Sequence, residues 1–407
     1  MSRILYVWEL GAGYGHVGSV LPLAVHLKER GHDVVFALRD LAHAERFLGR
    51  RGFALLQAPV WIGDRRGPDP PINYRPVNYA EMLTNFGFLD AAGLSSMVRA
   101  WRQLYTLVRP DLLLVDHGPT ALLAARGTGL RRALIGTGFA SPPRTSPLPT
   151  LRPWLNIAAE RLLEAERQVL ATMNALSGDL KIEPLQTMAD LFAVDEDFLC
   201  TFAELDHYTR TGAHYWGPLF AADEGVAPQW PAGSGERIFA YVSTAYRDFE
   251  KLVTQLGDLP YRSLIHAQGA SEKQIAKYQR RNVALSVEPI RMAQAAREAD
   301  LVICHGGHGT TAAALLAGRP VLVLHRQAEQ LLLAHSLVGA GFGKTVNVDS
   351  KNPSYKQLAR DIVSDSRYAQ RAGEFAAKYA DFDLGAQVSR IATRCEQLIA
   401  APPREKR

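Results

Sequence analysis

Residues 301–311 read LVICHGGHGTT, and this stretch decides the fold of the second half of the chain. Its apolar start predicts a short buried strand, its Gly/His run predicts a tight turn, and residues 312–317 continue as a helix. Glycines in such a turn let backbone N–H groups approach an anion, and the helix N-terminus adds partial positive charge. The stretch therefore predicts a site for a phosphate-bearing ligand, whereas the plainer interpretation is a turn whose glycines serve backbone geometry alone.

A second unit of the same kind opens the chain. Residues 3–10 form an apolar run, residues 11–16 read GAGYGH, and residues 21–27 are again apolar with helical spacing. One chain thus carries two units in which a strand, a Gly/His turn and a helix follow one another.

The remaining pattern predicts an α/β fold. Strand-like runs alternate with helical stretches such as 21–30 and 91–108, which indicates βαβ units and largely parallel sheets. The expected strands cover 3–7, 33–37, 111–115, 132–135, 237–242, 261–266, 283–287, 301–304 and 321–324. A chain of 407 residues fits two domains of roughly 200 residues each. We expect domains over 1–219 and 237–385, a linker over 220–236, and a final helix and tail over 386–407.

Composition narrows the class of protein. Hydrophobic residues make up 47% of the chain and the net charge is a mild +5 without basic blocks, apart from the tail at 404–407. We therefore expect a globular protein that does not bind nucleic acid. No apolar run approaches the ~18 residues of a membrane span, no signal peptide is recognised, and three scattered cysteines suit a reducing compartment. These features predict a cytoplasmic protein.

Polar residues in the second turn and in the segment after it are candidate ligand contacts. His305 can donate a hydrogen bond to a phosphate while neutral, and Thr310 offers a hydroxyl. Glu329 and Gln330 pair a carboxylate with an amide, a combination suited to vicinal hydroxyls, although a polar first turn of a helix would look the same. Two Pro-rich segments, 61–76 and 140–153, read as long loops that would border a ligand crevice.

The stretch 301–343 resembles the donor-binding region of nucleotide-sugar glycosyltransferases of the GT-B type, particularly the UDP-glycosyltransferase and macrolide glycosyltransferase group. That family carries a His-Gly-Gly-x-Gly-Thr/Ser turn, then Gly-x-Pro, an acidic residue followed by Gln, and Gly-x-Gly. Here these motifs fall at 305–310, 318–320, 329–330 and 341–343.

The resemblance implies roles for individual residues on the donor side. His305, His308 and the amides around Gly307, Gly309 and Thr310 would hold the diphosphate, and Glu329 with Gln330 would bind hydroxyls of the transferred sugar. The backbone near Ile290 would contact the base. Thr244 stands where the family usually has Ser, and would replace it as a phosphate contact; Gly15 is also assigned to donor binding.

The resemblance extends to the first turn. The family has Gly-His before a helix that contains proline, as Gly15-His16 and Pro22 do here, and its histidine deprotonates the acceptor. A histidine suits this task because its ordinary pKa lies near working pH. Asp116 ends an apolar run after Pro110-Asp111, as the family's partner Asp does, and would orient His16. The alternative for Asp116 is a cap on the following turn.

Other interpretations remain open from the sequence. Gly13-x-Gly15-x-x-Gly18 with Asp40 also fits an NAD or FAD site, and a sugar-nucleotide epimerase or hydrolase would need the same phosphate turn. His305 and His308 lack nearby carboxylates and no Asp-x-Asp pair is suitable, so we expect neither a metal site nor a cofactor.

Taken together, the resemblance implies two Rossmann-like domains facing each other across a cleft, the first for the acceptor and the second for the donor. The last helix would cross back to the first domain. The expected reaction is metal-independent, inverting transfer from a UDP- or dTDP-sugar to a hydroxyl of a small-molecule or lipid acceptor. If the acceptor is apolar, we expect the protein to contact a membrane peripherally in order to reach it.

Overall fold

The computed structural model describes residues 1–11, 15–61, 76–221, 223–347 and 350–402. The chain divides into two compact units. Unit 1 comprises residues 1–202, 210–221 and 383–407, and unit 2 comprises residues 203–209 and 222–382. Each unit is built around its own six-stranded sheet.

The sheet of unit 1 is parallel throughout, with the strand order β3-β2-β1-β4-β5-β6. Its strands are β1 (Arg3–Trp8), β2 (Asp33–Leu38), β3 (Ala54–Gln57), β4 (Leu112–Asp116), β5 (Arg131–Gly136) and β6 (Glu196–Leu199). The main helices are α1 (Gly15–Glu29), α2 (Leu41–Phe47), α3 (Tyr79–Leu83), α4 (Ala91–Val108), α5 (Pro119–Ala125), α6 (Ala159–Asn174), α7 (Ser177–Leu180) and α15 (Leu384–Ala400).

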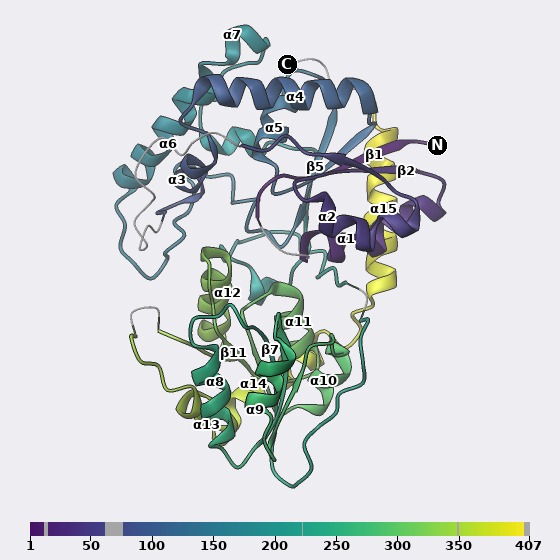
Figure 1. Cartoon of the computed structure of the whole chain (residues 1–407). Helices are drawn as coiled ribbons and strands as arrows, with labels where there is room; N and C mark the ends of the chain where they lie inside the picture. The colour runs from purple at the N-terminus through teal and green to yellow at the C-terminus, as the bar shows by residue number, and fades with distance from the viewer. Residues whose placement is uncertain (12–14, 62–75, 222, 348–349, 403–407) are drawn as a thin grey trace. The chain divides into compact units, whose positions relative to one another are not determined.

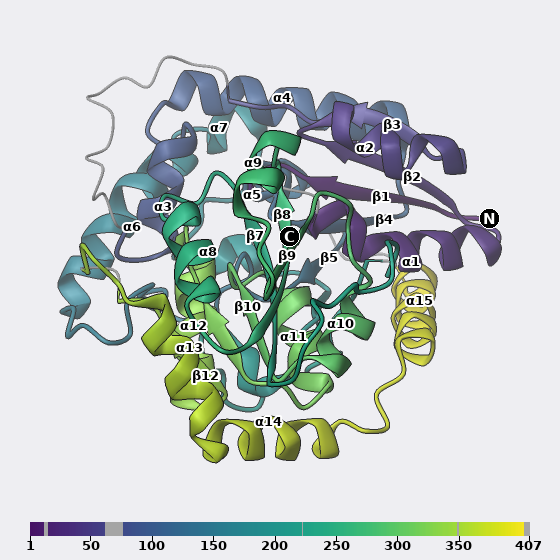
Figure 2. The same ribbon diagram turned by 60° about the horizontal axis from the view of Figure 1, so that its bottom comes forward.

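Helices cover both faces of this sheet, which explains why its strands are apolar without alternation. Along β1, Leu5 and Val7 pack in one core with residues of α4 and α5. Ile4, Tyr6 and Trp8 pack in another core with residues of α1 and α15. Figures 1 and 2 show α15 beside α1, so the last helix of the chain belongs to the body of unit 1.

Unit 2 repeats the topology. Its parallel strands have the order β12-β11-β10-β7-β8-β9. They are β7 (Arg237–Ser243), β8 (Arg262–Gln268), β9 (Val283–Ser286), β10 (Leu301–Cys304), β11 (Val321–Val323) and β12 (Gly343–Thr345). The helices are α8 (Phe249–Gly257), α9 (Glu272–Tyr278), α10 (Met292–Glu298), α11 (His308–Leu316), α12 (Ala328–Gly339), α13 (Tyr355–Ser364) and α14 (Ser366–Lys378).

Both sheets have the strand order of a dinucleotide-binding Rossmann fold, counted from the first strand of each unit. The order reverses between β1 and β4 in unit 1 and between β7 and β10 in unit 2. Ligands of open parallel sheets bind beyond the carboxyl ends of the strands at such a reversal. Gly11 and His16, which flank the undescribed part of the first Gly/His turn, follow β1, and the second turn follows β10, so these residues lie at the reversals of the two sheets.

The α/β class and the repeated Rossmann-like plan predicted from the sequence are confirmed. The central strands lie where they were expected, but β3, β6 and β12 were missed. Most of the loop at 61–76 falls outside the described residues. Within the predicted linker over 220–236, Val226 pairs with Ile290 in an isolated parallel bridge. This part of the segment is therefore attached to unit 2 by backbone hydrogen bonds.

Gly343→Ala tests the packing of β12 against β11. A Cβ at Gly343, where φ is +156°, would lie 1.8 Å from the carbonyl oxygen of Val321, so the strand has to move away and the melting temperature should fall by several degrees. Gly373→Ala is the matched control, because a Cβ there meets nothing within 4 Å inside α14 and Ala favours a helix by about 0.5–1 kcal/mol. Equal melting temperatures for the two variants in calorimetry would contradict this packing.

Candidate active site

His16 and Asp116 meet at the strand-order reversal of unit 1. His16 is the second residue of α1, directly after the first Gly/His turn, and Asp116 is the last residue of β4. The Nδ1 atom of His16 lies 2.7 Å from Oδ2 of Asp116, and the two side chains are 21% and 12% exposed. Since a carboxylate only accepts, His16 donates through Nδ1, and in a neutral ring Nε2 would then be the nitrogen that carries the lone pair. This is the arrangement that a general base requires.

Two aromatic residues of β1 hold this pair in place. The Tyr6 hydroxyl is 2.8 Å from Oδ2 of Asp116 and 3.1 Å from the carbonyl oxygen of His16, and burial raises the pKa of Tyr6 well above its usual value. The Trp8 indole stacks on the His16 ring with centroids 5.1 Å apart. Neither residue was singled out in the sequence, because both look like ordinary members of an apolar strand.

The Nε2 atom of His16 faces Gly11. A Cβ at Gly11, which has a φ of +98°, would lie 2.9 Å from that nitrogen and 3.6 Å from Nδ1 of His117. Gly11 is therefore required both for its left-handed backbone and for the space that the imidazole uses. The two histidine rings flank the same position.

His117 therefore lies close to the pair. In an extended strand the side chain after Asp116 would point to the opposite face, but β4 ends at Asp116 and His117 has a left-handed φ of 47°. Its ring packs against Tyr79 and Phe139. Burial, and then the nearby His16, lower the pKa of His117 to about 3, so the ring is neutral at physiological pH.

In unit 2, the turn after β10 has the form of an anion cradle. Gly306 has a φ of +78°, and a Cβ there would lie 2.8 Å from Val323, so glycine is needed for close packing on β11. Gly307 is exposed, and a Cβ there would meet nothing within 4 Å. Gly307 precedes α11, whose first residues are His308, Gly309 and Thr310. The first N–H groups of a helix lack intrahelical partners and attract anions.

His305 differs from the expectation. Its Nε2 accepts a hydrogen bond from the N–H of Ser243 at 2.9 Å, and its Nδ1 lies 2.9 Å from the carbonyl oxygen of Leu324. Since a carbonyl only accepts, Nδ1 carries the hydrogen, and burial lowers the pKa of His305. Both ring nitrogens are used, so in this structure no N–H of His305 is left for a phosphate. The ring instead braces the ends of β7 and β11 on either side of β10.

The other predicted donor residues of unit 2 also follow strand ends. Thr244 comes after β7, and its hydroxyl donates to the carbonyl oxygen of Gln268 at 3.3 Å. Gln330 lies in the first turn of α12; its Oε1 accepts from the N–H of Arg326 at 2.8 Å, and its Cβ lies 3.4 Å from the position that a Cβ of Gly306 would take. Gln330 therefore also stabilises the start of its helix. This is the simpler of its two interpretations, a polar first turn of a helix rather than a contact with sugar hydroxyls.

Three further predicted donor residues lie at or near the ends of helices or strands. Glu329 precedes Gln330 in the same turn. Ile290 is buried between β9 and α10. Gly15 is the exposed first residue of α1 and belongs to unit 1, whereas the other predicted donor residues belong to unit 2.

A histidine that the sequence did not single out lies near His308. The segment 203–209 belongs to unit 2, where the carbonyl oxygen of Asp206 accepts from Ser336 of α12 at 2.9 Å. It brings the His207 ring to a centroid distance of 6.5 Å from His308. Burial, and then His207, lower the pKa of His308 to about 3. His308 is therefore neutral at the start of α11.

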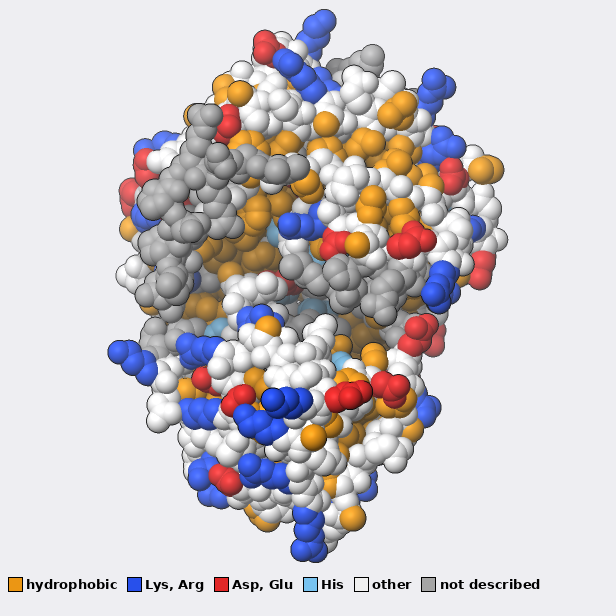
Figure 3. Space-filling model, viewed as in Figure 1, with side chains coloured by type: hydrophobic (Ala, Val, Ile, Leu, Met, Phe, Trp, Pro, Cys, Tyr) orange, Lys and Arg blue, Asp and Glu red, His pale blue; other side chains and the backbone are white. Residues whose placement is uncertain are grey.

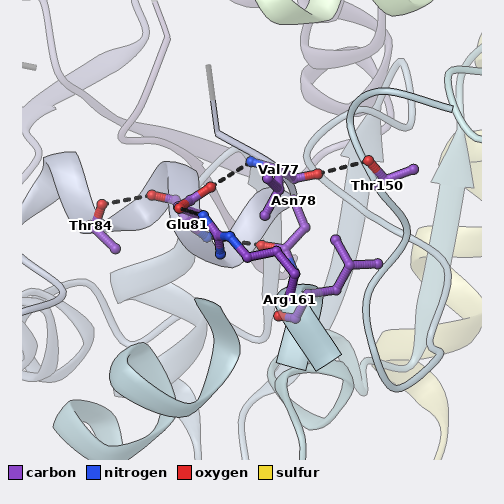
Figure 4. A network of polar contacts seen from close by, with 7 residues as sticks. Val77, Asn78, Glu81, Thr84, Thr150 and Arg161 are labelled. Atoms are coloured by element: carbon purple, nitrogen blue, oxygen red, sulfur yellow. Dashed lines mark hydrogen bonds and ion pairs between the residues drawn. The ribbon is translucent and has the colours of Figure 1, made fainter. Parts of the chain in front are cut away.

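Hydrogen bonds fix the second Pro-rich segment, predicted as a loop over 140–153, to other residues of unit 1 (Figure 4). Thr150 donates its hydroxyl to the carbonyl oxygen of Val77 at 3.0 Å, and the N–H of Val77 donates to Glu81 at 2.6 Å. Arg161 pairs with Glu81 from α6. Asn78 donates to the carbonyl oxygen of Leu162 at 3.2 Å. The segment 148–151 is thus fixed to the residues that begin α3.

Among the described residues, no group of three or more His, Cys, Asp or Glu side chains could hold a metal ion. No helix among these residues is long and apolar enough to span a membrane. On the face seen in Figure 3, acidic side chains lie among the Lys and Arg side chains.

His305→Ala separates a bracing role from direct phosphate contact. The variant leaves the N–H of Ser243 and the carbonyl oxygen of Leu324 without their partner, which costs about 1–3 kcal/mol for each buried group. We expect a lower melting temperature in the absence of any nucleotide. An unchanged melting temperature together with lost nucleotide binding would instead mean that the ring contacts the phosphate.

Comparison with known proteins adds to this geometry. The C-terminal domain of the erythromycin biosynthesis protein CIII-like family matches residues 250–397. A PGL/p-HBAD biosynthesis glycosyltransferase of Mycobacterium tuberculosis is 24% identical over 401 residues, which cover 93% of this chain and 89% of that protein. A PGL/p-HBAD biosynthesis rhamnosyltransferase of Mycobacterium bovis is 25% identical over 328 residues, which cover 74% of this chain and 71% of that protein.

Solved structures with the same fold cover almost the whole chain. The calicheamicin glycosyltransferase CalG4 superposes with a TM-score of 0.74 at 16% identity, covering 98% of this chain and 99% of that one. The glycotransferase of kitacinnamycin has a TM-score of 0.71 at 19% identity, with the same coverage of 98% and 99%. The fold that the motifs indicated is confirmed: the chain has the GT-B fold of these glycosyltransferases, and in sequence it is similar to UDP-glycosyltransferase-like proteins.

Proposed function

We propose that the protein is an inverting glycosyltransferase that moves a sugar from a nucleotide diphosphate to an acceptor hydroxyl, with His16 as the general base. The glycosyltransferase class rests on the comparisons above. The direction of attack, the donor and the acceptor are inferred from the two sites.

The observation that carries the proposal is the contact between His16 and Asp116. Nδ1 of His16 donates to the carboxylate at 2.7 Å, so in the neutral ring Nε2 would be the nitrogen that accepts the proton of the acceptor hydroxyl. Asp116 would then stabilise the imidazolium that forms as the acceptor hydroxyl loses its proton. The oxygen would attack the anomeric carbon as the bond to the diphosphate breaks, so the configuration at that carbon would invert.

The donor is assigned to unit 2. The N–H groups at the start of α11, from His308 to Thr310, would hold the diphosphate together with the hydroxyl of Thr244, and the exposed Gly307 leaves room for approach. Glu329 and Gln330 would bind sugar hydroxyls, and the backbone at Ile290 would contact the base. Helix N–H groups would stabilise the leaving diphosphate, so no metal ion is required in this scheme.

The names of the similar proteins narrow the choice of substrates. One structure of the same fold is a spinosyn rhamnosyltransferase complexed with thymidine diphosphate, with a TM-score of 0.66 at 17% identity. Another contains the same enzyme with the spinosyn aglycone. We therefore favour a dTDP- or UDP-sugar as donor and an apolar small molecule or lipid with a hydroxyl group as acceptor, reached in the last case by peripheral contact with a membrane.

His16→Ala should reduce turnover by ~10²- to 10⁴-fold, the usual contribution of a general base. Nucleotide binding by unit 2 should stay unchanged, because the residue lies in unit 1. Single-turnover rates and calorimetric titration with the nucleotide measure the two effects. Wild-type turnover in the folded variant would eliminate His16 as the base.

Thermal-shift titration with UDP, dTDP, GDP and NAD tests the donor assignment. We expect stabilisation by UDP or dTDP, and its loss in Gly307→Val, which fills the open approach to α11. Gly339→Ala serves as a control, because a Cβ there also meets nothing within 4 Å but lies at the far end of α12. Stabilisation by NAD alone would favour a dinucleotide-binding protein instead.

A further inference from the structure

Glu9 is a buried carboxylic acid that follows Trp8, whose ring stacks on His16, and nothing in the proposed reaction uses it. It comes directly after β1 and is only 2% exposed. Acidic side chains are almost never buried to this extent without a specific partner. The hydrogen bonds of Glu9 therefore have to account for its burial.

Glu9 supplies the N-terminal cap of α5 from a distant part of the sequence. Its Oε2 accepts hydrogen bonds from the N–H groups of Thr120 at 3.1 Å and Ala121 at 3.2 Å. Pro119 opens the helix and has no N–H, so these are the first two helix donors that lack intrahelical partners. The usual solution is a Ser, Thr, Asp or Asn at the N-cap position.

The N-cap position of α5 cannot carry such a residue. It is occupied by Gly118, and a Cβ there would lie 2.9 Å from Val115 and 3.0 Å from Val7. The close approach of the turn to β1 and β4 thus excludes a local capping side chain. Glu9 takes over this function from the neighbouring strand end.

Glu9 also connects the end of β1 to the turn that follows Asp116. Trp8 lies opposite Asp116 in the parallel ladder of β1 and β4. Beyond it, the N–H groups of Glu9 and Leu10 both approach the carbonyl oxygen of His117, at 3.3 and 2.9 Å. The backbone and the side chain of Glu9 therefore hold both ends of the segment 117–121, which begins one residue after Asp116.

We propose that Glu9 is a positioning residue for the glycosyl-transfer reaction: its carboxyl, held at the start of α5, fixes the turn after Asp116 and thereby the geometry of the His16–Asp116 pair. The inference rests on the proposed function of that pair. It assigns to Glu9 no contact with either substrate.

The protonation state of Glu9 follows from its surroundings. Burial raises its pKa to about 8, against the opposing effect of the two N–H groups of α5 and, more weakly, of Arg39. Among the described residues, the Glu9 charge helps to raise the pKa of Tyr105 of α4, and the carbonyl oxygen of the neutral His117 accepts from the backbone N–H of Glu9. Its second oxygen, Oε1, has no hydrogen-bond partner. At neutral pH Glu9 is thus an uncharged acid, and as the pH rises through about 8 it becomes a buried, incompletely solvated anion.

Three variants test this role. Glu9→Gln keeps an oxygen acceptor for Thr120 and Ala121 and replaces the acid O–H by an amide, but cannot ionise. Glu9→Ala removes the acceptor. Glu166→Gln is the matched control, because Glu166 is also a buried acid with a raised pKa that accepts a backbone hydrogen bond, in its case from Leu148.

We expect kcat of the wild-type protein to fall as the pH rises through about 8, a fall that Glu9→Gln removes and Glu166→Gln retains. At pH 7, Glu9→Gln should match the wild type, and Glu9→Ala should lose roughly tenfold to 100-fold in kcat, the scale of a small misplacement of reacting groups, with nucleotide affinity unchanged. An identical alkaline fall in Glu9→Gln and the wild type, or full kcat in folded Glu9→Ala, would overturn the proposal.

A measurement without substrates keeps the test of Glu9 separate from that of the proposed function. In protein labelled with ¹⁵N-histidine, the Nδ1–H of His16 bonded to Asp116 should give a resonance at pH 7 in the wild type and in Glu9→Gln. We expect it to shift or vanish in Glu9→Ala, and to change above pH 8 in the wild type only. An unchanged resonance in Glu9→Ala would refute the positioning role, whereas absence of any turnover in the wild type would refute only the proposed reaction.

Discussion

The register between β1 and β4 is the constraint on which the candidate base depends. Trp8 lies opposite Asp116, and successive side chains of a strand point to opposite faces, so a slip of one residue would turn Asp116 away from His16. Both faces of the sheet are buried under helices, which makes any such slip costly. Tyr6 and Trp8 of β1 contact the pair, and Glu9, the residue directly after β1, contacts the start of α5. The end of one strand thus organises the base, its partner and the following helix.

The two units share a topology but use their histidines differently. His16 has one ring nitrogen on a carboxylate, and its other nitrogen lies beside the side-chain-free Gly11. His305 has both ring nitrogens on backbone groups of neighbouring strand ends. The first arrangement would make Nε2 the nitrogen for proton transfer, while the second holds the ring as a brace at the turn before α11. This difference agrees with the proposed base in unit 1 and the proposed anion cradle in unit 2.

Much of this could be predicted from the sequence, and what could not has physical causes. The central strands are continuous apolar runs, and the contact of His16 with Asp116 follows from the neighbouring parallel strands β1 and β4, because His16 begins the helix after β1 and Asp116 ends β4. The strands β3, β6 and β12 are short edge strands; β3, for example, reads ALLQ and has no fully buried residue, so its pattern is weak. Glu9 was missed because its partners are backbone N–H groups 111 and 112 positions away. The engagement of both His305 nitrogens was missed for the same reason, since the sequence does not show which carbonyl lies opposite a ring.

The stereochemistry of the product tests the central claim most directly. With an α-linked nucleotide sugar and an acceptor that the protein accepts, the anomeric coupling constant in the ¹H NMR spectrum of the first product reports the configuration. If His16 activates the acceptor for a single displacement, the product is β-linked. An α-linked product would contradict the account, because retention requires a route other than direct attack by the hydroxyl that His16 deprotonates.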